Sequence, residues 1–338
     1  MKMIVDVPGG FLDRIKELVQ IGHYSSIEEF LELAIMNQIK LEADTNIINN
    51  RILLSPFNQQ TNIIHFDKKL QLKEKYDIEE IMAPEDDEIE GNLLWGQYNR
   101  LLPVKFVVRY LANYLNENKK LANLDEFSEE ASEHARRFGL QLLDVDKTKK
   151  RIKGEKISTA FPIGNDPYKS KLRFKNHFVG YMDTSGKIIG APAQLKFIKI
   201  INDGSKKIGL TKFGAEFAKI LNPVLDENIE NENPFSADEI EFYITHLKNN
   251  LINEYGAIIF LLNQIKNGIT RPNELTEKVI LYDDNITKSQ ADIMRGGLVS
   301  RMSELGLINS IRVGMRGISY ELAPHGMTLI NAHGNGGH

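Results

Sequence analysis

The residues best suited to chemistry are the lysines and arginines in the middle of the chain. Residues 147–219 hold 17 Lys and Arg against 5 Asp and Glu, whereas residues 1–92 hold 9 against 18. Cationic side chains neutralise phosphates, and this neutralisation supplies most of the sequence-independent affinity of proteins for nucleic acid. The asymmetry therefore indicates a phosphate-facing surface in the middle of the chain. A lysine-rich face that meets only solvent would show the same pattern.

Residue patterns typical of enzymes and metal sites are missing from the sequence. There is no Walker-type loop, no GxGxxG motif and no pair of histidines four residues apart beside a glutamate. Without cysteine the chain has no disulfide framework and no thiol chemistry. We therefore predict no catalytic residue, no metal site and no cofactor, and we interpret His333 and His338 as parts of a polar tail.

The composition is that of an ordinary globular protein. The 338 residues are 42% hydrophobic and 26% charged, enough for two or three domains. No apolar run approaches the length of a transmembrane helix, and the N-terminus lacks the basic start and apolar stretch of a signal peptide. These features predict a cytoplasmic protein without a membrane partner.

Residues 1–42 predict one short strand followed by two helices. The strand covers Met3–Pro8, and a helix with a one-sided apolar stripe follows from about Phe11 to Ile21. Gly22 ends that helix, and a second one runs from about Ser26 to Leu41. A lone strand leaves both of its edges unpaired, so this unit cannot close a core by itself. We therefore expect a homodimer in which two such strands pair and four helices pack together.

With this order of elements, residues 2–42 resemble the ribbon-helix-helix family of dimeric DNA-binding proteins. The residues that carry the resemblance are Ile4–Pro8, Leu12, Leu18, Gly22–Ser26 and the run Phe30–Ile35. The resemblance implies a dimer interface, which we assign to Met3, Val5, Val7, Phe30 and Ile35.

Members of this family read the DNA major groove with alternate side chains of the paired strands. The resemblance therefore assigns Lys2, Ile4 and Asp6 to the groove, although a carboxylate at position 6 repels phosphate. It also assigns Ser25 and Ser26 to a phosphate contact at a helix N-terminus. A simple helix cap is the alternative interpretation of these two serines.

The rest of the chain is predicted to contain two further folded segments. We predict a linker with short ordered pieces at 43–92, a folded segment at 93–222, a linker at 223–236, a folded segment at 237–331 and a flexible tail at 332–338. In 93–222, helices are followed by alternating strands around the turn Asn202–Ser205 and by a helix that Thr211 caps. This order describes a winged helix with a long insertion.

The end of the chain carries a second resemblance. The string SRMSELGLIN…RGISYELAPHGMTLI is similar to the last part of a winged helix-turn-helix repressor domain, and the similarity covers about residues 239–331. It predicts a helix from Lys288 to Leu305, strands at 308–313 and 318–322, and a short closing helix.

These resemblances imply where DNA would be contacted. In a helix-turn-helix the second helix lies in the major groove, and the wing can reach the minor groove. The implied contacts in the C-terminal segment are Lys288, Ser289, Gln290, Arg295 and Arg301, with Arg312 and Arg316 on the wing. Those in the middle segment are Lys169, Lys171, Arg173, Lys175 and Asn176, with Lys206 and Lys207 on its wing.

We therefore expect a mainly α protein with short β segments, built from a ribbon-helix-helix dimer module and two winged helices. The predicted function is a homodimeric transcriptional regulator that binds double-stranded DNA at a two-fold or repeated operator. An effector ligand or a protein partner is left open. Two alternatives are a plasmid or virus replication or partition protein, and a protein- or RNA-binding scaffold or defence adaptor.

Overall fold

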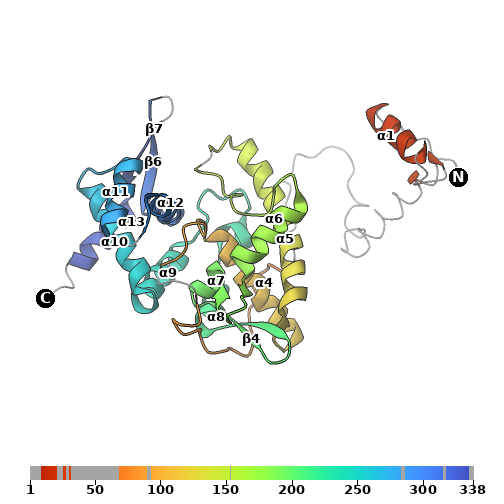
Figure 1. Cartoon of the computed structure of the whole chain (residues 1–338), viewed down its shortest axis with the longest axis horizontal. Helices are drawn as coiled ribbons and strands as arrows, with labels where there is room; N and C mark the ends of the chain where they lie inside the picture. The colour runs from red at the N-terminus through yellow and green to blue at the C-terminus, as the bar shows by residue number, and fades with distance from the viewer. Residues whose placement is uncertain are drawn as a thin grey trace. The chain divides into compact units, whose positions relative to one another are not determined.

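The computed structural model describes residues 9–20, 26–27, 30–31, 68–89, 93–152, 154–282, 286–314 and 317–334. The chain forms two compact units, residues 1–63 and 64–338. The described residues are mainly helical, with three small antiparallel sheets among them (Figure 1). The prediction of a mainly α protein with short β segments is therefore confirmed.

In the first unit, helix α1 spans Gly9–Gln20, close to the first helix that the sequence predicts. Its Ile15 is buried, as a residue of the predicted apolar stripe should be. Ile27, Phe30 and Leu31 are also helical, and they belong to the second predicted helix.

Helix α4 (Leu102–Asn118) lies at the centre of the second unit. Its sequence is apolar over most of its length, and Pro103 occupies the first turn, where the missing N–H of proline costs nothing. Nearly all of its side chains are buried, including those of Lys105 and Arg109. A buried cation is stable only when it is paired and hydrogen-bonded, so both residues must have partners inside the core.

Those partners come from the segment that follows residue 219. Lys105 pairs with Glu239 at 2.8 Å, and Arg109 pairs with Asp226 at 2.5 Å. Both cations also donate to the carbonyl oxygen of Ile220, at 2.8 Å and 2.9 Å. Burial lowers the pKa of Lys105 to about 8 and raises that of Glu239. These ion pairs fix α4 to the chain around residues 220–239.

After α4 the chain forms a long helix, an irregular connection, a helix that ends in a π turn, and a β hairpin. The elements are β1 (Ala122–Asn123), α5 (Leu124–Thr148), α6 (Pro167–Phe174), η1 (Lys175–Val179), β2 (Tyr181–Met182), β3 (Ile188–Ile189), α7 (Ala191–Gln194), β4 (Ile198–Asn202), β5 (Lys206–Leu210), α8 (Lys212–Lys219) and η2 (Pro223–Glu227). The hairpin β4–β5 joins β1 in a sheet of order β1-β5-β4, while β2 and β3 pair separately.

The hairpin β4–β5 is part of the hydrophobic core. Ile198 lies opposite Leu210 and Ile200 lies opposite Ile208, and all four side chains are buried. Thr211 then caps α8 with its hydroxyl group, as the sequence predicts.

Residues 68–89 belong to the stretch 43–92 that the sequence predicts as a linker with short ordered pieces. In the structure they lie within the second unit and pack against its core, where Leu70 is buried. The Ile81 N–H group donates to the carbonyl oxygen of Leu210 at 2.9 Å, so this segment extends the contacts of the sheet. The polar sequence suggested a connection, but its few apolar residues are anchored by the core.

The predicted linker 223–236 is also packed against the core. Its first residues form η2, in which Val224 and Leu225 are fully buried and Asp226 pairs with α4. Ile229 and Phe235 are buried as well, so this polar stretch contributes four apolar side chains and one paired carboxylate to the core.

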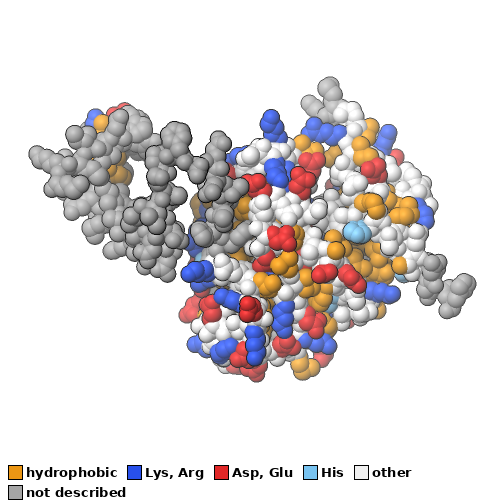
Figure 2. All heavy atoms as spheres, turned by 180° about the vertical axis from the view of Figure 1, so that it is seen from behind, with side chains coloured by type: hydrophobic (Ala, Val, Ile, Leu, Met, Phe, Trp, Pro, Cys, Tyr) orange, Lys and Arg blue, Asp and Glu red, His pale blue; other side chains and the backbone are white. Residues whose placement is uncertain are grey.

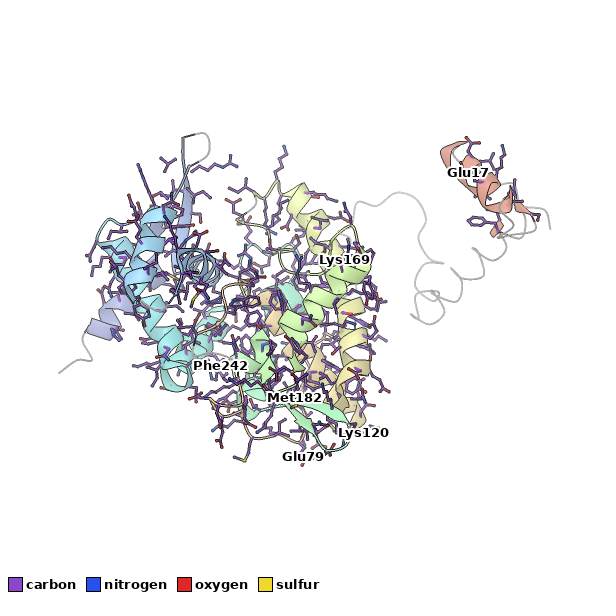
Figure 3. The ribbon with its side chains drawn as sticks, in the orientation of Figure 1. Glu17, Glu79, Lys120, Lys169, Met182 and Phe242 are labelled. Atoms are coloured by element: carbon purple, nitrogen blue, oxygen red, sulfur yellow. The ribbon has the colours of Figure 1, made fainter. Side chains whose placement is uncertain are left out.

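The C-terminal elements follow the predicted order closely. They are α9 (Ala237–Asn250), α10 (Ile252–Lys266), α11 (Pro272–Tyr282), α12 (Lys288–Glu304), β6 (Ile308–Val313), β7 (Gly317–Leu322) and α13 (Pro324–Gly334). Helix α9 joins the core through Phe242, whose ring stacks on Phe217 at 5.6 Å (Figure 3). Helix α13 continues to Gly334, past the predicted start of the tail at residue 332. None of the described helices is long and apolar enough to span a membrane.

Candidate functional site

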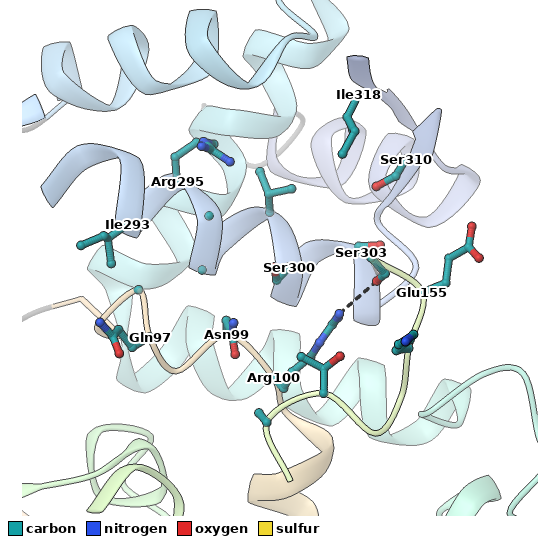
Figure 4. Close-up of a pocket in the computed structure, with 18 of the residues that line it drawn as sticks. Gln97, Asn99, Arg100, Glu155, Ile293, Arg295, Ser300, Ser303, Ser310 and Ile318 are labelled. Atoms are coloured by element: carbon teal, nitrogen blue, oxygen red, sulfur yellow. Dashed lines mark hydrogen bonds between the residues drawn. The ribbon is translucent and has the colours of Figure 1, made fainter. Parts of the chain in front are cut away.

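The described residues of the second unit form a groove of about 1090 Å³. One wall is formed by α12 and the hairpin β6–β7, and the other by residues near α6 and by the irregular segment 152–161. Gln97, Asn99 and Arg100 lie along the groove beside α12 (Figure 4). Pockets between two packed segments of a chain are common ligand sites, so we take this groove as the candidate site.

Two glycines let α12 approach the segment that forms one edge of the groove. A Cβ atom on Gly297 would lie 2.5 Å from the carbonyl oxygen of Gly96, closer than any real side chain allows. A Cβ atom on Gly96 would overlap the backbone of Ile293 in the same way. Both positions therefore require glycine, and a larger residue would push α12 away from the groove.

A buried ion pair holds the same helix in place. Arg301 of α12 donates to Glu254 Oε1 at 3.0 Å and 2.6 Å, and to the carbonyl oxygen of Tyr98 at 2.7 Å. The other Glu254 oxygen accepts from the N–H group of Leu94 at 3.2 Å. Arg301 is fully buried, so its predicted contact with DNA is wrong. Its role is to fasten α12 to the segment that precedes α4.

The lining of the groove is cationic. Five arginines and lysines line it among the described residues, against the carboxylates of Glu155 and Asp292. The five are Arg100, Lys156, Arg173, Arg295 and Arg312. Asp292 pairs with Arg295, which holds the pKa of that carboxyl below its usual range and reduces the charge that Arg295 can offer. The excess of positive charge suits an anionic ligand.

Aromatic side chains adjoin one end of the groove. The His177 ring lines it and makes edge contacts with Trp95 and Tyr98, with ring centroids 5.6 Å and 5.7 Å away. Burial lowers the pKa of His177, and the charge of Arg173 lowers it further. His177 is therefore neutral at physiological pH and does not add to the charge of the groove.

The predicted contacts of the C-terminal segment fall into different environments. Lys288 and Ser289 are exposed at the start of α12, and Arg312 is exposed on the hairpin β6–β7. The Gln290 amide oxygen accepts from the Thr287 N–H group and hydroxyl, each at 2.8 Å, in a capping box. A bidentate contact with adenine needs that oxygen, so we reassign Gln290 to capping. Arg316 lies outside the described residues.

Most of the predicted contacts of the middle segment lie away from the groove. Of these residues only Arg173 lines it. Lys171 and Lys175 pair with Glu129 of α5, at 3.1 Å and 2.8 Å, and Lys171 also pairs with Glu133. Lys169 projects from the first turn of α6 and is exposed (Figure 3), and Asn176 is half-buried.

The predicted wing residues of the middle segment are similarly occupied. Lys206 donates to the carbonyl oxygen of Met182 at 3.1 Å, and Lys207 pairs with Asp203 at 2.9 Å. Neither residue lines the groove.

Several cations of residues 147–219 form ion pairs with carboxylates that are distant in the sequence. Lys196 pairs with Asp86 at 2.8 Å, and Lys199 pairs with Glu88 at 2.9 Å. On the face shown in Figure 2, cationic and anionic side chains are interleaved over the second unit. A basic stretch of sequence has therefore become a mixed surface, because the acidic segment before α4 folds onto it.

Most residues predicted to act in the first unit lie outside the described residues. They are the predicted contacts with the DNA major groove (Lys2, Ile4 and Asp6), Ser25, and the predicted dimer residues Met3, Val5, Val7 and Ile35. Ser26 is half-buried and its carbonyl oxygen accepts from the N–H group of Phe30 at 3.2 Å, which fits a helix start.

Several lining residues were not predicted from the sequence. They are Gln97, Asn99, Arg100, Lys156, Ser300, Ser303 and Ser310. The polar run before Pro103 was the only signal for the first three, and it resembles an ordinary helix start. Among the described residues, no three His, Asp or Glu side chains gather closely enough to hold a metal ion.

Comparison with protein-family models, curated proteins and solved structures finds no match for this chain.

Proposed function

We propose that the chain binds double-stranded DNA through the start of α12, the hairpin β6–β7 and the cationic rim of the groove. The order of elements supports this proposal. Helices α11 and α12 followed by the hairpin β6–β7 have the order expected of a winged helix-turn-helix. Strand β1 between α4 and α5, joined to the later hairpin in the sheet order β1-β5-β4, is compatible with a second winged helix.

One observation carries the proposal. The first turn of α12 and the β6–β7 hairpin are exposed beside a groove with five cations and two carboxylates in its described lining. Lys288 and Arg312 are the exposed cations of these two elements, and Arg173 belongs to the opposite wall. Cations placed in this way would contact phosphates on either side of a major groove that receives α12.

The regulatory role follows from such binding. A protein that occupies a promoter excludes other proteins, and two copies joined through residues 1–42 would suit an operator of two-fold symmetry. The homodimer, the ribbon-helix-helix module and the role in transcription are parts of this proposal. A replication or partition protein would bind in the same way at a different kind of site.

The salt dependence of binding to random-sequence duplex tests the proposal. Each phosphate contact contributes about −0.9 to the slope of log affinity against log salt. We expect Arg312→Ala to reduce the slope by about 1 unit and Lys206→Ala, at the tip of the buried hairpin, to leave it unchanged. A wild-type slope near zero would refute the proposal.

A second candidate function is the binding of a protein partner. The wing carries exposed apolar side chains at Ile311, Val313 and Ile318, which are unusual on a surface that contacts phosphates. Under this alternative Ile311→Ser together with Val313→Ser would abolish partner capture, while binding to duplex would be absent in the wild type as well.

A further inference from the structure

Arg100 occupies an unusual position beside α12 in the groove. Its side chain is only 8% exposed, and its Nε atom is buried without a hydrogen-bond partner in the part of the chain that the structure describes. Its Nη2 atom donates to the carbonyl oxygen of Gly154 at 3.0 Å, across the groove from α12 (Figure 4). A guanidinium carries five N–H donors, so this residue retains unused hydrogen-bonding capacity.

No carboxylate forms an ion pair with Arg100 among the described residues. Arg100 and Glu304 interact through their charges, but the oxygens of Glu304 accept from the N–H groups of Leu101 at 2.5 Å and Leu102 at 3.3 Å rather than from the guanidinium. A buried guanidinium with an unsatisfied N–H group and no hydrogen-bonded carboxylate is costly, and an anion that enters the groove would relieve that cost. Lys105, Arg109 and Arg301 differ, because each has its own carboxylate.

The remaining lining indicates what kind of anion would fit. Lys156, Arg173 and Arg312 line the same groove, so a ligand with several negative charges is favoured. Phe161, Phe174 and His177 add aromatic surface along the same groove. A volume of about 1090 Å³ exceeds what a single phosphate needs and suits a ligand with both a planar and an anionic part. We infer that the groove binds a free nucleotide whose phosphates contact Arg100 and Lys156.

A free nucleotide suits this site better than a duplex does. Arg100 is almost fully buried, whereas the backbone of a duplex contacts side chains on the outer surface of a protein. The exposed rim can meet a duplex while Arg100 meets a small molecule. The inference therefore does not rest on DNA binding, and either can fail without the other.

Such a ligand would contact parts of the chain that are far apart in sequence. Arg100 and Lys156 lie before residue 160, whereas α12 and the hairpin β6–β7 lie after residue 287. A ligand that binds both walls stabilises their present separation. Arg173 on the opposite wall and Arg312 on the hairpin β6–β7 are cations of the proposed DNA-binding surface. A ligand that fixes their separation would therefore act as an effector of the proposed DNA binding.

Binding of adenosine triphosphate, guanosine triphosphate, triphosphate and inorganic phosphate to the full-length chain tests this inference. Calorimetry and thermal unfolding, both without DNA, are the measurements. We expect a nucleoside triphosphate to bind and to raise the unfolding temperature more than triphosphate or phosphate does. Arg100→Gln should weaken this binding by about tenfold or more, since a charged hydrogen bond is lost. Arg100→Lys should weaken it less.

The matched control is Lys206→Gln, which removes a cation from the β4–β5 turn outside the groove. It should bind the nucleotide like the wild type. If Arg100→Gln does not fold, Lys156→Gln replaces it. Lys156 is half-buried, so its substitution should lower the stability of the fold less. Wild-type affinity in both groove variants overturns the inference. So does a nucleotide that binds no better than phosphate, or an Arg100 effect seen only with a duplex added as a separate probe.

Discussion

Two hairpins of the second unit, β4–β5 and β6–β7, have the same local design and opposite environments. Hairpin β4–β5 buries Ile198, Ile200, Ile208 and Leu210 and pairs with a third strand, β1. Hairpin β6–β7 is a two-stranded sheet whose strands are exposed over most of their length. The first hairpin is therefore part of the core, and the second is available to a partner.

This contrast shows that similar sequence patterns can form either a buried core hairpin or an exposed one. Both hairpins alternate apolar and polar residues and carry cations near their turns. In the hairpin β4–β5, Lys207 forms an ion pair with Asp203. In the hairpin β6–β7, Arg312 is exposed and lines the groove. Three experiments test the difference between the buried and the exposed region.

The largest effect on stability is expected for Arg301, the buried arginine that fastens α12 to Glu254 and to the segment before α4. Arg301→Ala would leave Glu254 buried without its counter-ion, and the free energy of unfolding should fall by about 3–5 kcal/mol. Arg312→Ala, on the exposed hairpin, should change it by less than about 0.5 kcal/mol. Urea denaturation measures both values, and equal effects would show that Arg301 is not buried as described.

A comparison inside the hairpins should give the next largest difference. Ile200→Ala removes a side chain that is 1% exposed, and we expect a loss of about 2–5 kcal/mol in the free energy of unfolding. Ile311→Ala removes one that is 42% exposed, and we expect a loss of less than about 1 kcal/mol. The same denaturation curves supply the measurement. A larger loss for Ile311 would place the second hairpin in a core as well.

The smallest effect concerns pH and a histidine next to the buried hairpin. Burial lowers the pKa of His246 to about 4, while its Nε2 atom contacts the carbonyl oxygen of Leu195 at 2.8 Å. Because the pKa of His246 is lower in the folded chain than in the unfolded chain, protonation of His246 favours the unfolded state. This contribution to stability is therefore complete above about pH 6.5 and is lost as the pH falls toward 4.

The expected loss is up to about 3 kcal/mol over that interval. His246→Gln should be less stable at neutral pH but should show a flatter dependence between pH 6.5 and 4. His325→Gln, an exposed position on α13, is the control and should retain the wild-type dependence. Identical pH profiles for His246→Gln and the wild type would contradict the assignment.

The order of helices and strands could be predicted well where local signals are strong. Thr211 caps its helix as the sequence predicts, and the helix expected from Lys288 to Leu305 is observed as α12. The packing of residues 68–89 and 223–236 could not be predicted, because the composition of both stretches is polar. A few buried apolar residues, such as Leu70 and Val224, hold these two segments against the core.

The candidate groove was predicted only in part. Arg173, Arg295 and Arg312 could be named from their places on expected helices and wings. Arg100 could not, because neither its neighbours nor its spacing distinguishes it from a surface arginine. Arg301 was assigned to DNA for the converse reason, since a cation on an expected recognition helix is predicted to be exposed until its partner Glu254 is located.

The sequence by itself determined the helices, the hairpins and their order, because capping, periodicity and turn residues act over a few positions. Only the tertiary structure decided which charges remain available. An ion pair such as Lys199 with Glu88 joins residues more than a hundred positions apart, and the energy of a charge depends on its neighbours in space. For this reason several cations of the basic stretch are paired with distant carboxylates, whereas Arg100, which lies outside that stretch, is buried without an ion pair among the described residues.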